Sequence, residues 1–237
     1  MNLYDLTVND RTKIALDDVF FSDENKAKIT QIVKEHQHLE ELKKFNLQVD
    51  NKILLHGHSG CGKTTTAKAI ATALNKPIII LNLSTFVSSK IGETSLNIKS
   101  VFDKAARDRA VLFLDEFDQI GKIRGNDEKD VGEMRRLVNT IIQLIDYLSP
   151  DTILICATNH YSILDSALLR RFQLKLEYVL PNQEELDNYY ERILAEFPQS
   201  TRGLERIYDI SYAEVKDYIH TTVKRMIIGK LESGEEI

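Results

Sequence analysis

The stretch GHSGCGKT, residues 57–64, decides the fold class, because it follows an apolar run and precedes helical sequence. Its spacing matches G-x-x-x-x-G-K-[ST], the pattern of phosphate-binding loops. The glycines let backbone amides converge on phosphate oxygens, and the following helix adds its positive end. A lysine supplies a point charge, and a hydroxyl can ligate Mg²⁺. The sequence therefore predicts a nucleoside triphosphate site built from Gly57, His58, Ser59, Gly60, Cys61, Gly62, Lys63, Thr64 and Thr65.

Five short apolar runs alternate with helical sequence between residues 52 and 178. This alternation predicts an α/β fold of the P-loop NTPase class, with a five-stranded, mostly parallel, doubly wound sheet. The middle runs are continuously apolar, whereas the last alternates with polar residues and is expected at the sheet edge. The expected strands are Lys52–His56, Pro77–Leu81, Ala110–Asp115, Thr152–Ala157 and Phe172–Tyr178. The expected helices are Asp23–Phe45, Lys63–Leu74, Leu96–Arg107 and Glu133–Tyr147, and Gly121–Asp130 is expected to be a loop.

The strand signals stop after Pro181, and helical patterns replace them. Asn182 followed by Glu185, and Ser211 followed by Glu214, have the spacing of capping boxes that open helices. The C-terminal part is therefore expected to be a small α-helical domain. The expected segments are an N-terminal arm (1–21), an α/β nucleotide-binding domain (22–180) and the helical domain (181–237).

The composition fits one large core with a small appendage, since the chain has 237 residues of which 43% are hydrophobic. Its 31 basic and 36 acidic residues give a formal charge of -5, which argues against a general nucleic-acid binder. No apolar run approaches the roughly 20 residues that span a bilayer, and the start lacks a basic leader. Cys61 and Cys156 are interpreted as reduced, buried thiols. These features predict a cytoplasmic protein without a membrane partner, and the histidine spacing predicts no zinc site.

Two adjacent carboxylates, Asp115 and Glu116, end the third apolar run. Adjacent residues at a strand end point in different directions, so the two can have different functions. Asp115 is suited to orient hydrated Mg²⁺, and Glu116 is suited to polarise a water aimed at the γ-phosphate. The pair therefore predicts hydrolysis in addition to binding, although an Asp-Glu pair after a strand can also simply open a helix.

Asn159 follows the fourth apolar run, where its amide can hydrogen-bond a γ-phosphate or an attacking water. A turn-forming asparagine is the alternative. A loop lysine, an Asp-Glu pair and an asparagine at successive strand ends are the order expected of one site at the carboxyl edge of a parallel sheet.

Together these motifs resemble those of AAA-family ATPases, over roughly residues 17–230. The resemblance identifies the phosphate loop as Walker A, Leu114–Glu116 as Walker B and Asn159 as sensor 1. It also implies that Asp18 and Val19 lie near the nucleotide and that the C-terminal helical domain is a lid. The implied cofactors are ATP and Mg²⁺.

The stretch Leu164–Phe172 resembles the second region of homology, where the family places arginine fingers. The resemblance implies that Arg170 and Arg171 reach a nucleotide held by a neighbouring subunit. It therefore implies a homo-oligomeric ring, usually a hexamer, because such a finger has no target in a monomer. Solvated charges before an edge strand are the alternative for both arginines.

The sequence departs from the family pattern at two places. Ala213 aligns with the lid segment near the adenosine, but Tyr212 replaces the usual glycine there. Lys90, Ile91 and Gly92 align with the central pore loop of members that thread polypeptides, yet Lys90 occupies the position of the usual aromatic residue. A loop that merely joins helices is the alternative for this stretch.

The favoured reading is a minimal AAA ATPase that hydrolyses ATP in a ring and remodels or unfolds a protein substrate. The first alternative is a regulatory ATPase whose ATP-dependent assembly controls a separate effector, such as a protease or a nuclease. The second alternative is a small-molecule P-loop kinase. Glu116, Asn159 and the pair Arg170-Arg171 argue against the kinase, because a kinase needs an acceptor pocket in place of a water-activating acid.

Overall fold

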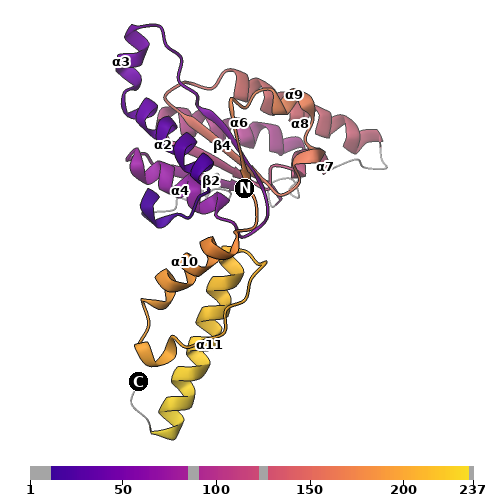
Figure 1. The fold of residues 1–237 in the computed structure, drawn as a ribbon. Coiled ribbons are helices and arrows are strands. Elements are labelled where there is room, and N and C mark those ends of the chain that lie inside the picture. Colours follow the sequence, from indigo (N-terminus) through magenta and orange to yellow (C-terminus); the bar gives the residue numbers. More distant parts are fainter. Residues whose placement is uncertain (1–11, 85–90, 123–127, 235–237) are drawn as a thin grey trace. The chain divides into compact units, whose positions relative to one another are not determined.

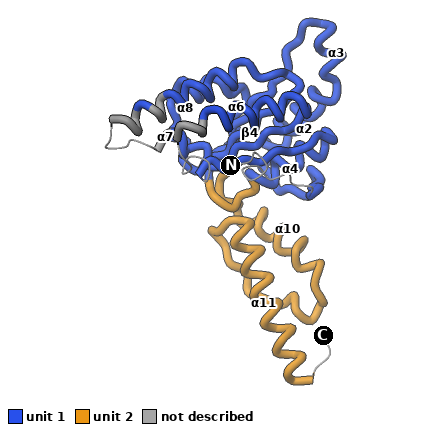
Figure 2. The backbone as a smooth tube through the Cα atoms, turned by 180° about the vertical axis from the view of Figure 1, so that it is seen from behind, with its two compact units in different colours: residues 1–57, 63–177 blue, residues 58–62, 178–237 orange. Residues whose placement is uncertain are grey.

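The computed structural model describes residues 12–84, 91–122 and 128–234 of the chain. These residues form two compact units, which Figure 2 shows in different colours. The larger unit comprises the described residues up to Gly57 and from Lys63 to Glu177, and the smaller comprises His58–Gly62 and the described residues from Tyr178 onward. The middle of the phosphate loop therefore belongs to the same unit as the C-terminal helices.

The sheet of the larger unit has the strand order β2-β3-β4-β1-β5. The pairs β1–β4, β2–β3 and β3–β4 are parallel, with registers such as Ile53↔Ile155 and Phe113↔Ile155. The predicted five-stranded parallel sheet is thereby confirmed, and β5 lies at its edge as predicted. The strands are β1 (Lys52–Gly57), β2 (Ile78–Asn82), β3 (Val111–Asp115), β4 (Ile153–Thr158) and β5 (Leu174–Tyr178).

Helices cover both faces of this sheet because its central strands are apolar on both sides. On one face, α6 (Ile91–Arg107) and α8 (Glu128–Asp146) share a core with Leu112, Leu114 and Leu154. On the other, α4 (Lys63–Ala73) contacts β3 and β4, and α2 (Asp23–Gln37) contacts α4 (Figure 1). The shorter elements of this unit are η1 (Leu16–Asp18), α3 (Leu39–Lys44), α7 (Gln119–Lys122), η2 (Tyr161–Ile163) and α9 (Ser166–Leu169).

The smaller unit is built from α10 (Gln183–Leu194), η3 (Gln199–Thr201) and α11 (Tyr212–Ser233). Both predicted capping boxes are present, since Asn182 and Ser211 each accept from the backbone amide three residues later. The two long helices bury one shared apolar cluster, which consists of Leu186, Tyr190, Ile193, Leu194, Val215, Ile219 and Val223. No helix within the described ranges combines the length and the apolarity that crossing a bilayer requires.

Several helix boundaries differ from the sequence prediction. The single helix expected over Asp23–Phe45 is interrupted at His38, whose φ of -108° and ψ of 19° leave the helical region. The ring of the neighbouring His36 is held by the Asp50 carbonyl oxygen at 2.9 Å, which is a tertiary contact that helical periodicity does not reveal. Helices α6 and α8 begin earlier than expected, at Ile91 and Glu128, so the charged loop predicted over Gly121–Asp130 is too long.

Candidate active site

Three glycines of the phosphate loop have positive φ angles: 120° at Gly57, 74° at Gly60 and 98° at Gly62. Side chains with a Cβ rarely adopt this region, so the loop conformation requires glycine at these positions. Chain reversals of this kind turn backbone N–H groups toward a common concave side, which suits an anion. The backbone of residues 57–62 therefore has the conformation that the motif needs.

The start of α11 packs against the middle of this loop within the smaller unit. The Ala213 amide donates to the Gly60 carbonyl oxygen at 3.1 Å. A Cβ on Gly60 would lie 2.5 Å from Ser211 Oγ, so the approach leaves no room for a side chain. Tyr212, which replaces the usual glycine, packs its ring 4.9 Å from that of Tyr189. Burial raises the pKa of the Tyr212 hydroxyl, so the ring is neutral at physiological pH.

Lys63 begins α4 and is only 8% exposed, although its side chain is cationic. Its ammonium group donates to the Gly57 carbonyl oxygen at 2.9 Å, which holds the charge at the beginning of the loop. A buried cation beside a helix N-terminus attracts a polyanion strongly, because little water screens the interaction.

Asp115 lies at the end of β3, and the Thr64 side chain lies near its carboxylate, where it favours the ionised form. Burial raises the pKa of Asp115, while the Glu116 amide and the charge of Lys63 partly offset that rise. A hydroxyl and a carboxylate are hard oxygen ligands, and Mg²⁺ binds through few protein ligands while it keeps several waters. Thr64 and Asp115 therefore fit the predicted Mg²⁺, which would also offset the cost of ionising Asp115.

Glu116 has a φ of 53°, in the left-handed region that residues with a Cβ seldom adopt. Its amide donates to Asp115 Oδ1 at 2.9 Å. The backbone therefore leaves the extended conformation of β3 at Glu116. Strained backbone of this kind clusters at functional sites, where the surrounding structure maintains it.

Asn159 follows β4 and its side chain is exposed, as a group that contacts a ligand requires. Two neighbouring residues escaped the sequence analysis. Thr158 Oγ1 donates to Asp118 Oδ1 at 2.8 Å, and it accepts from the His160 amide at 2.9 Å. The second aspartate of the stretch Asp115-Glu116-Phe117-Asp118 was the signal that could have identified Asp118.

The structure distinguishes the two predicted finger residues. Arg171 is half-buried, donates to both carboxylate oxygens of Asp146 at 3.2 and 3.4 Å, and also donates to the Ala167 carbonyl oxygen at 2.6 Å. Arg170 is exposed, and its Nε donates to the Ser166 carbonyl oxygen at 3.2 Å. Arg170 is therefore the more available of the two for a contact outside its own subunit.

The remaining predicted site residues lie in varied settings. Cys61 is buried, and its Sγ donates to the Ser59 carbonyl oxygen at 3.6 Å. Thr65 is half-buried in the first turn of α4, and His58 is exposed with its amide donating to the Tyr178 carbonyl oxygen at 2.7 Å.

Asp18 ends η1 and is exposed, and Val19 follows it half-buried. In the predicted pore loop, the backbone of Ile91 and Gly92 forms the beginning of α6, whereas Lys90 lies outside the described residues.

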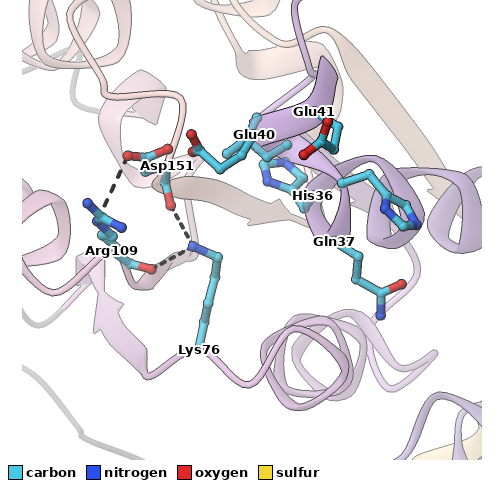
Figure 3. Close-up of a pocket in the computed structure, with 9 residues that line it drawn as sticks. His36, Gln37, Glu40, Glu41, Lys76, Arg109 and Asp151 are labelled. Atoms are coloured by element: carbon cyan, nitrogen blue, oxygen red, sulfur yellow. Dashed lines mark hydrogen bonds and ion pairs between the residues drawn. The ribbon is translucent and has the colours of Figure 1, made fainter. Parts of the chain in front are cut away.

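A pocket of about 280 Å³ lies at the opposite edge of the sheet, beside the residues that precede the strands (Figure 3). We call this the amino edge, and the edge where Asp115 and Thr158 end their strands the carboxyl edge. At the amino edge, the Lys76 ammonium group donates to the Arg109 and Asp151 carbonyl oxygens at 3.0 and 2.7 Å. Asp151 also accepts from Lys43 at 2.8 Å. These bonds join the segments before β2, β3 and β4, so the charges around this pocket serve the fold.

Comparison with known proteins connects this arrangement to a family. Residues 53–180 match the profile of the ATPase family associated with various cellular activities (AAA). An uncharacterized AAA family ATPase, y4kL of Sinorhizobium fredii, is 32% identical over 222 residues, which are 92% of this chain and 67% of that protein. A putative 26S proteasome regulatory subunit homolog of Methanothermobacter thermautotrophicus is 28% identical over 233 residues, which are 94% of this chain and 61% of that protein.

A third relative is the ATP-dependent zinc metalloprotease FTSH 6, chloroplastic, of Arabidopsis thaliana. It is 34% identical over 182 residues, which are 72% of this chain and 26% of that protein. The chain thus spans about two thirds or less of each of these relatives. The phosphate loop, the Asp115-Glu116 pair and Asn159 all fall within the part that matches the family profile.

Proposed function

This chain belongs to the AAA family of ATPases, and on that premise we propose that it hydrolyses Mg-ATP in an oligomeric ring and remodels a protein. The observation that carries the proposal is the pair of adjacent carboxylates at the end of β3, where the Thr64 side chain and the charge of Lys63 lie near the carboxylate of Asp115. A nucleotide site that only binds has no need of the second carboxylate, whereas hydrolysis needs a base for the attacking water.

The residues of the site have separate roles in this proposal. The loop amides and Lys63 bind the phosphates, and Thr64 and Asp115 hold Mg²⁺. Bound Mg²⁺ neutralises negative charge on the phosphate oxygens. Glu116 accepts a proton from the attacking water, and Asn159 donates a hydrogen bond that orients this water or the γ-phosphate.

A neighbouring copy completes the site by supplying Arg170 in this proposal. The exposure of Arg170 supports this choice, as does the series of bonds that retain Arg171 within its own subunit. A guanidinium group placed at the γ-phosphate stabilises the charge that develops in the transition state. ATP would then also favour assembly, because it binds two subunits at once.

A second candidate function is regulatory: ATP-dependent assembly would switch a separate effector such as a protease. The lysine at position 90, where threading members carry an aromatic residue, favours this candidate. The two candidates differ in what they require of residues 90–92. Threading predicts that Ile91→Ala and Lys90→Glu spare basal hydrolysis and abolish work on a substrate, whereas regulation predicts normal effector output in both variants.

Mixed oligomers test the shared active site. Arg170→Ala chains and Glu116→Gln chains should each be inactive alone. Every interface in such an oligomer lacks either the arginine or the glutamate. Mixing them should restore part of the activity, since one kind of interface then has both groups intact. The assay is phosphate release at fixed total protein, with co-assembly verified by light scattering. A mixture that co-assembles and stays inactive contradicts the shared site.

A further inference from the structure

We propose that Asp118 and Thr158 are positioning residues: their buried hydrogen bond places Asn159 and the Glu116 turn in register with each other. The inference rests on the proposed hydrolytic function, and it assigns roles to two residues that no motif marks. Both side chains are buried, since Asp118 is 3% exposed and Thr158 is 1% exposed. Both act through their neighbours in the chain.

The Thr158 hydroxyl forms the first connection. It donates to Asp118 Oδ1 at 2.8 Å and accepts from the His160 amide at 2.9 Å. Asn159 is the residue between these two anchored positions. A single hydroxyl therefore fixes the backbone on both sides of Asn159, and Asp118 fixes the orientation of that hydroxyl.

The backbone forms the second connection. The regular register between β3 and β4 ends at Leu114↔Cys156. Beyond it, the Phe117 amide donates to the Ala157 carbonyl oxygen at 2.8 Å. Residues 117 and 118 are thus joined to residues 157 and 158 by one main-chain bond and one side-chain bond, just past the point where the ladder stops.

Glu116 lies immediately before this double connection, in the left-handed turn described above. The next residue, Phe117, is fully buried, and its ring meets that of Phe172 edge-on at 5.6 Å. The turn that carries the proposed base therefore has rigid support on its C-terminal side. A small displacement of a catalytic group is costly, because misplacement by about 1 Å can lower a rate about 100-fold.

The choice of an acid at position 118 also favours a positioning role over simple packing. Taking a carboxylate out of water is unfavourable unless hydrogen bonds compensate, and an apolar residue would fill the same space without that cost. The Thr158 hydroxyl supplies part of that compensation by donating to Asp118 Oδ1. The benefit of an acid at position 118 is therefore a fixed geometry of the segments that carry Glu116 and Asn159.

The test is a double-mutant cycle between Thr158→Val and Asn159→Ala, measured as kcat for ATP hydrolysis. Valine keeps the volume of threonine and removes the hydroxyl, so we expect kcat to fall about 10-fold or more, with the Kd for ADP within about 2-fold of wild type. In the Asn159→Ala background the same change should lower kcat by less than about 2-fold, because the positioned group is already absent. Thr158→Ser, which retains the hydroxyl, should keep most of the wild-type rate.

Thr152→Val is the matched control at the other end of β4. Thr152 is also fully buried, but its hydroxyl has no hydrogen-bond partner among the residues that the structure describes, so this change should leave kcat unaltered. If Thr158→Val does not fold, Asp118→Asn replaces it in the cycle, since the amide retains the shape and weakens the bond.

An equal fold-decrease in kcat from Thr158→Val in the wild-type and Asn159→Ala backgrounds would overturn the positioning role, because the loss would then be independent of Asn159. So would a Thr158→Val chain that hydrolyses ATP at the wild-type rate. A wild-type chain without hydrolysis would instead contradict the proposed function, and with it this inference, so the two failures are distinguishable.

Discussion

The two edges of the sheet both carry charged side chains, but they differ in what the surroundings do to a carboxylate. At the amino edge, the hydrogen bond from Lys43 lowers the pKa of Asp151. At the carboxyl edge, burial raises the pKa of Asp115, although Lys63 lies near it. The protein therefore stabilises the ionised form of one carboxylate and disfavours the ionised form of the other.

This difference distinguishes a carboxylate that stabilises the fold, Asp151, from a carboxylate suited to bind a cation, Asp115. An ionised carboxylate whose pKa is lowered in the folded state adds to stability, whereas one whose pKa is raised subtracts from it. Proteins keep such unfavourable groups mainly at sites of function. A bound cation at the carboxyl edge would supply the compensation that Lys43 supplies at the amino edge.

The largest expected effect is on ATP affinity, when one lysine at each edge is replaced by alanine. Lys63→Ala should raise the Kd for ATP about 100-fold, since a charge-assisted hydrogen bond to phosphate is lost in a buried setting. Lys76→Ala is the matched control, because Lys76 bonds only to carbonyl oxygens among the contacts described above. It should lower the unfolding midpoint in urea and leave the ATP affinity unchanged. Calorimetric titration measures both affinities. An equal loss of ATP affinity in the two variants would contradict the assignment of different roles to the two edges.

Gly60→Ala tests the loop that follows β1. The new Cβ would meet Ser211 Oγ at 2.5 Å and would sit at a φ of +74°. We expect a loss of about 1–3 kcal/mol of folding stability, together with weaker ATP binding.

Gly229→Ala provides the control for Gly60→Ala, since a Cβ there would have no neighbour within 4 Å in the described part of the chain and the residue is inside α11. It should raise stability by up to about 1 kcal/mol, because alanine is the better helix former. Urea unfolding measures the stability of both variants. A Gly60→Ala chain as stable as wild type would contradict the close approach of Gly60 to Ser211.

The smallest expected effects are changes of stability with opposite sign at the two edges. Without nucleotide at neutral pH, Asp115→Asn should stabilise the fold by about 0.5–1 kcal/mol, and Asp151→Asn should destabilise it by up to about 1 kcal/mol. The contribution of Asp151 is present above its ordinary pKa of 3.8 and is lost as the pH falls through its lower folded value. The penalty from Asp115 develops as the pH rises through 3.8 and its raised folded value.

Urea midpoints at neutral and acid pH provide the measurement for this pair. The difference in urea midpoint between Asp151→Asn and wild type should shrink in acid, because the Asp151 carboxyl of the wild type is then protonated in both the folded and the unfolded protein. Midpoints that shift in the same direction for both variants at neutral pH would contradict the assignment of the two edges.

The sequence was sufficient for the sheet because its signals are local. Continuous apolar runs gave four strands, the polar alternation in Leu174–Tyr178 identified the edge strand, and Ser211 with Glu214 marked the start of α11. The loop glycines could also be predicted from the sequence, because residues with a Cβ rarely adopt the positive φ angles found at Gly57, Gly60 and Gly62.

The features that the sequence did not reveal depend on contacts between distant segments. The bond from Thr158 to Asp118 spans 40 positions, and the break at His38 accompanies a contact from His36 to the Asp50 carbonyl oxygen. The contact of Ala213 with Gly60 likewise joins segments far apart in the chain. Local periodicity carries no information about such pairs, so they appear only when the chain is folded.

The central claim is that the carboxyl edge performs hydrolysis, and Glu116→Gln tests it most directly. The variant keeps the shape of the side chain and removes the base, so it should bind ATP with a Kd within about 3-fold of wild type and lose at least about 100-fold in turnover. Glu40→Gln, at the pocket on the amino edge, is the control and should hydrolyse ATP normally. ATP turnover at the wild-type rate by Glu116→Gln would contradict the account.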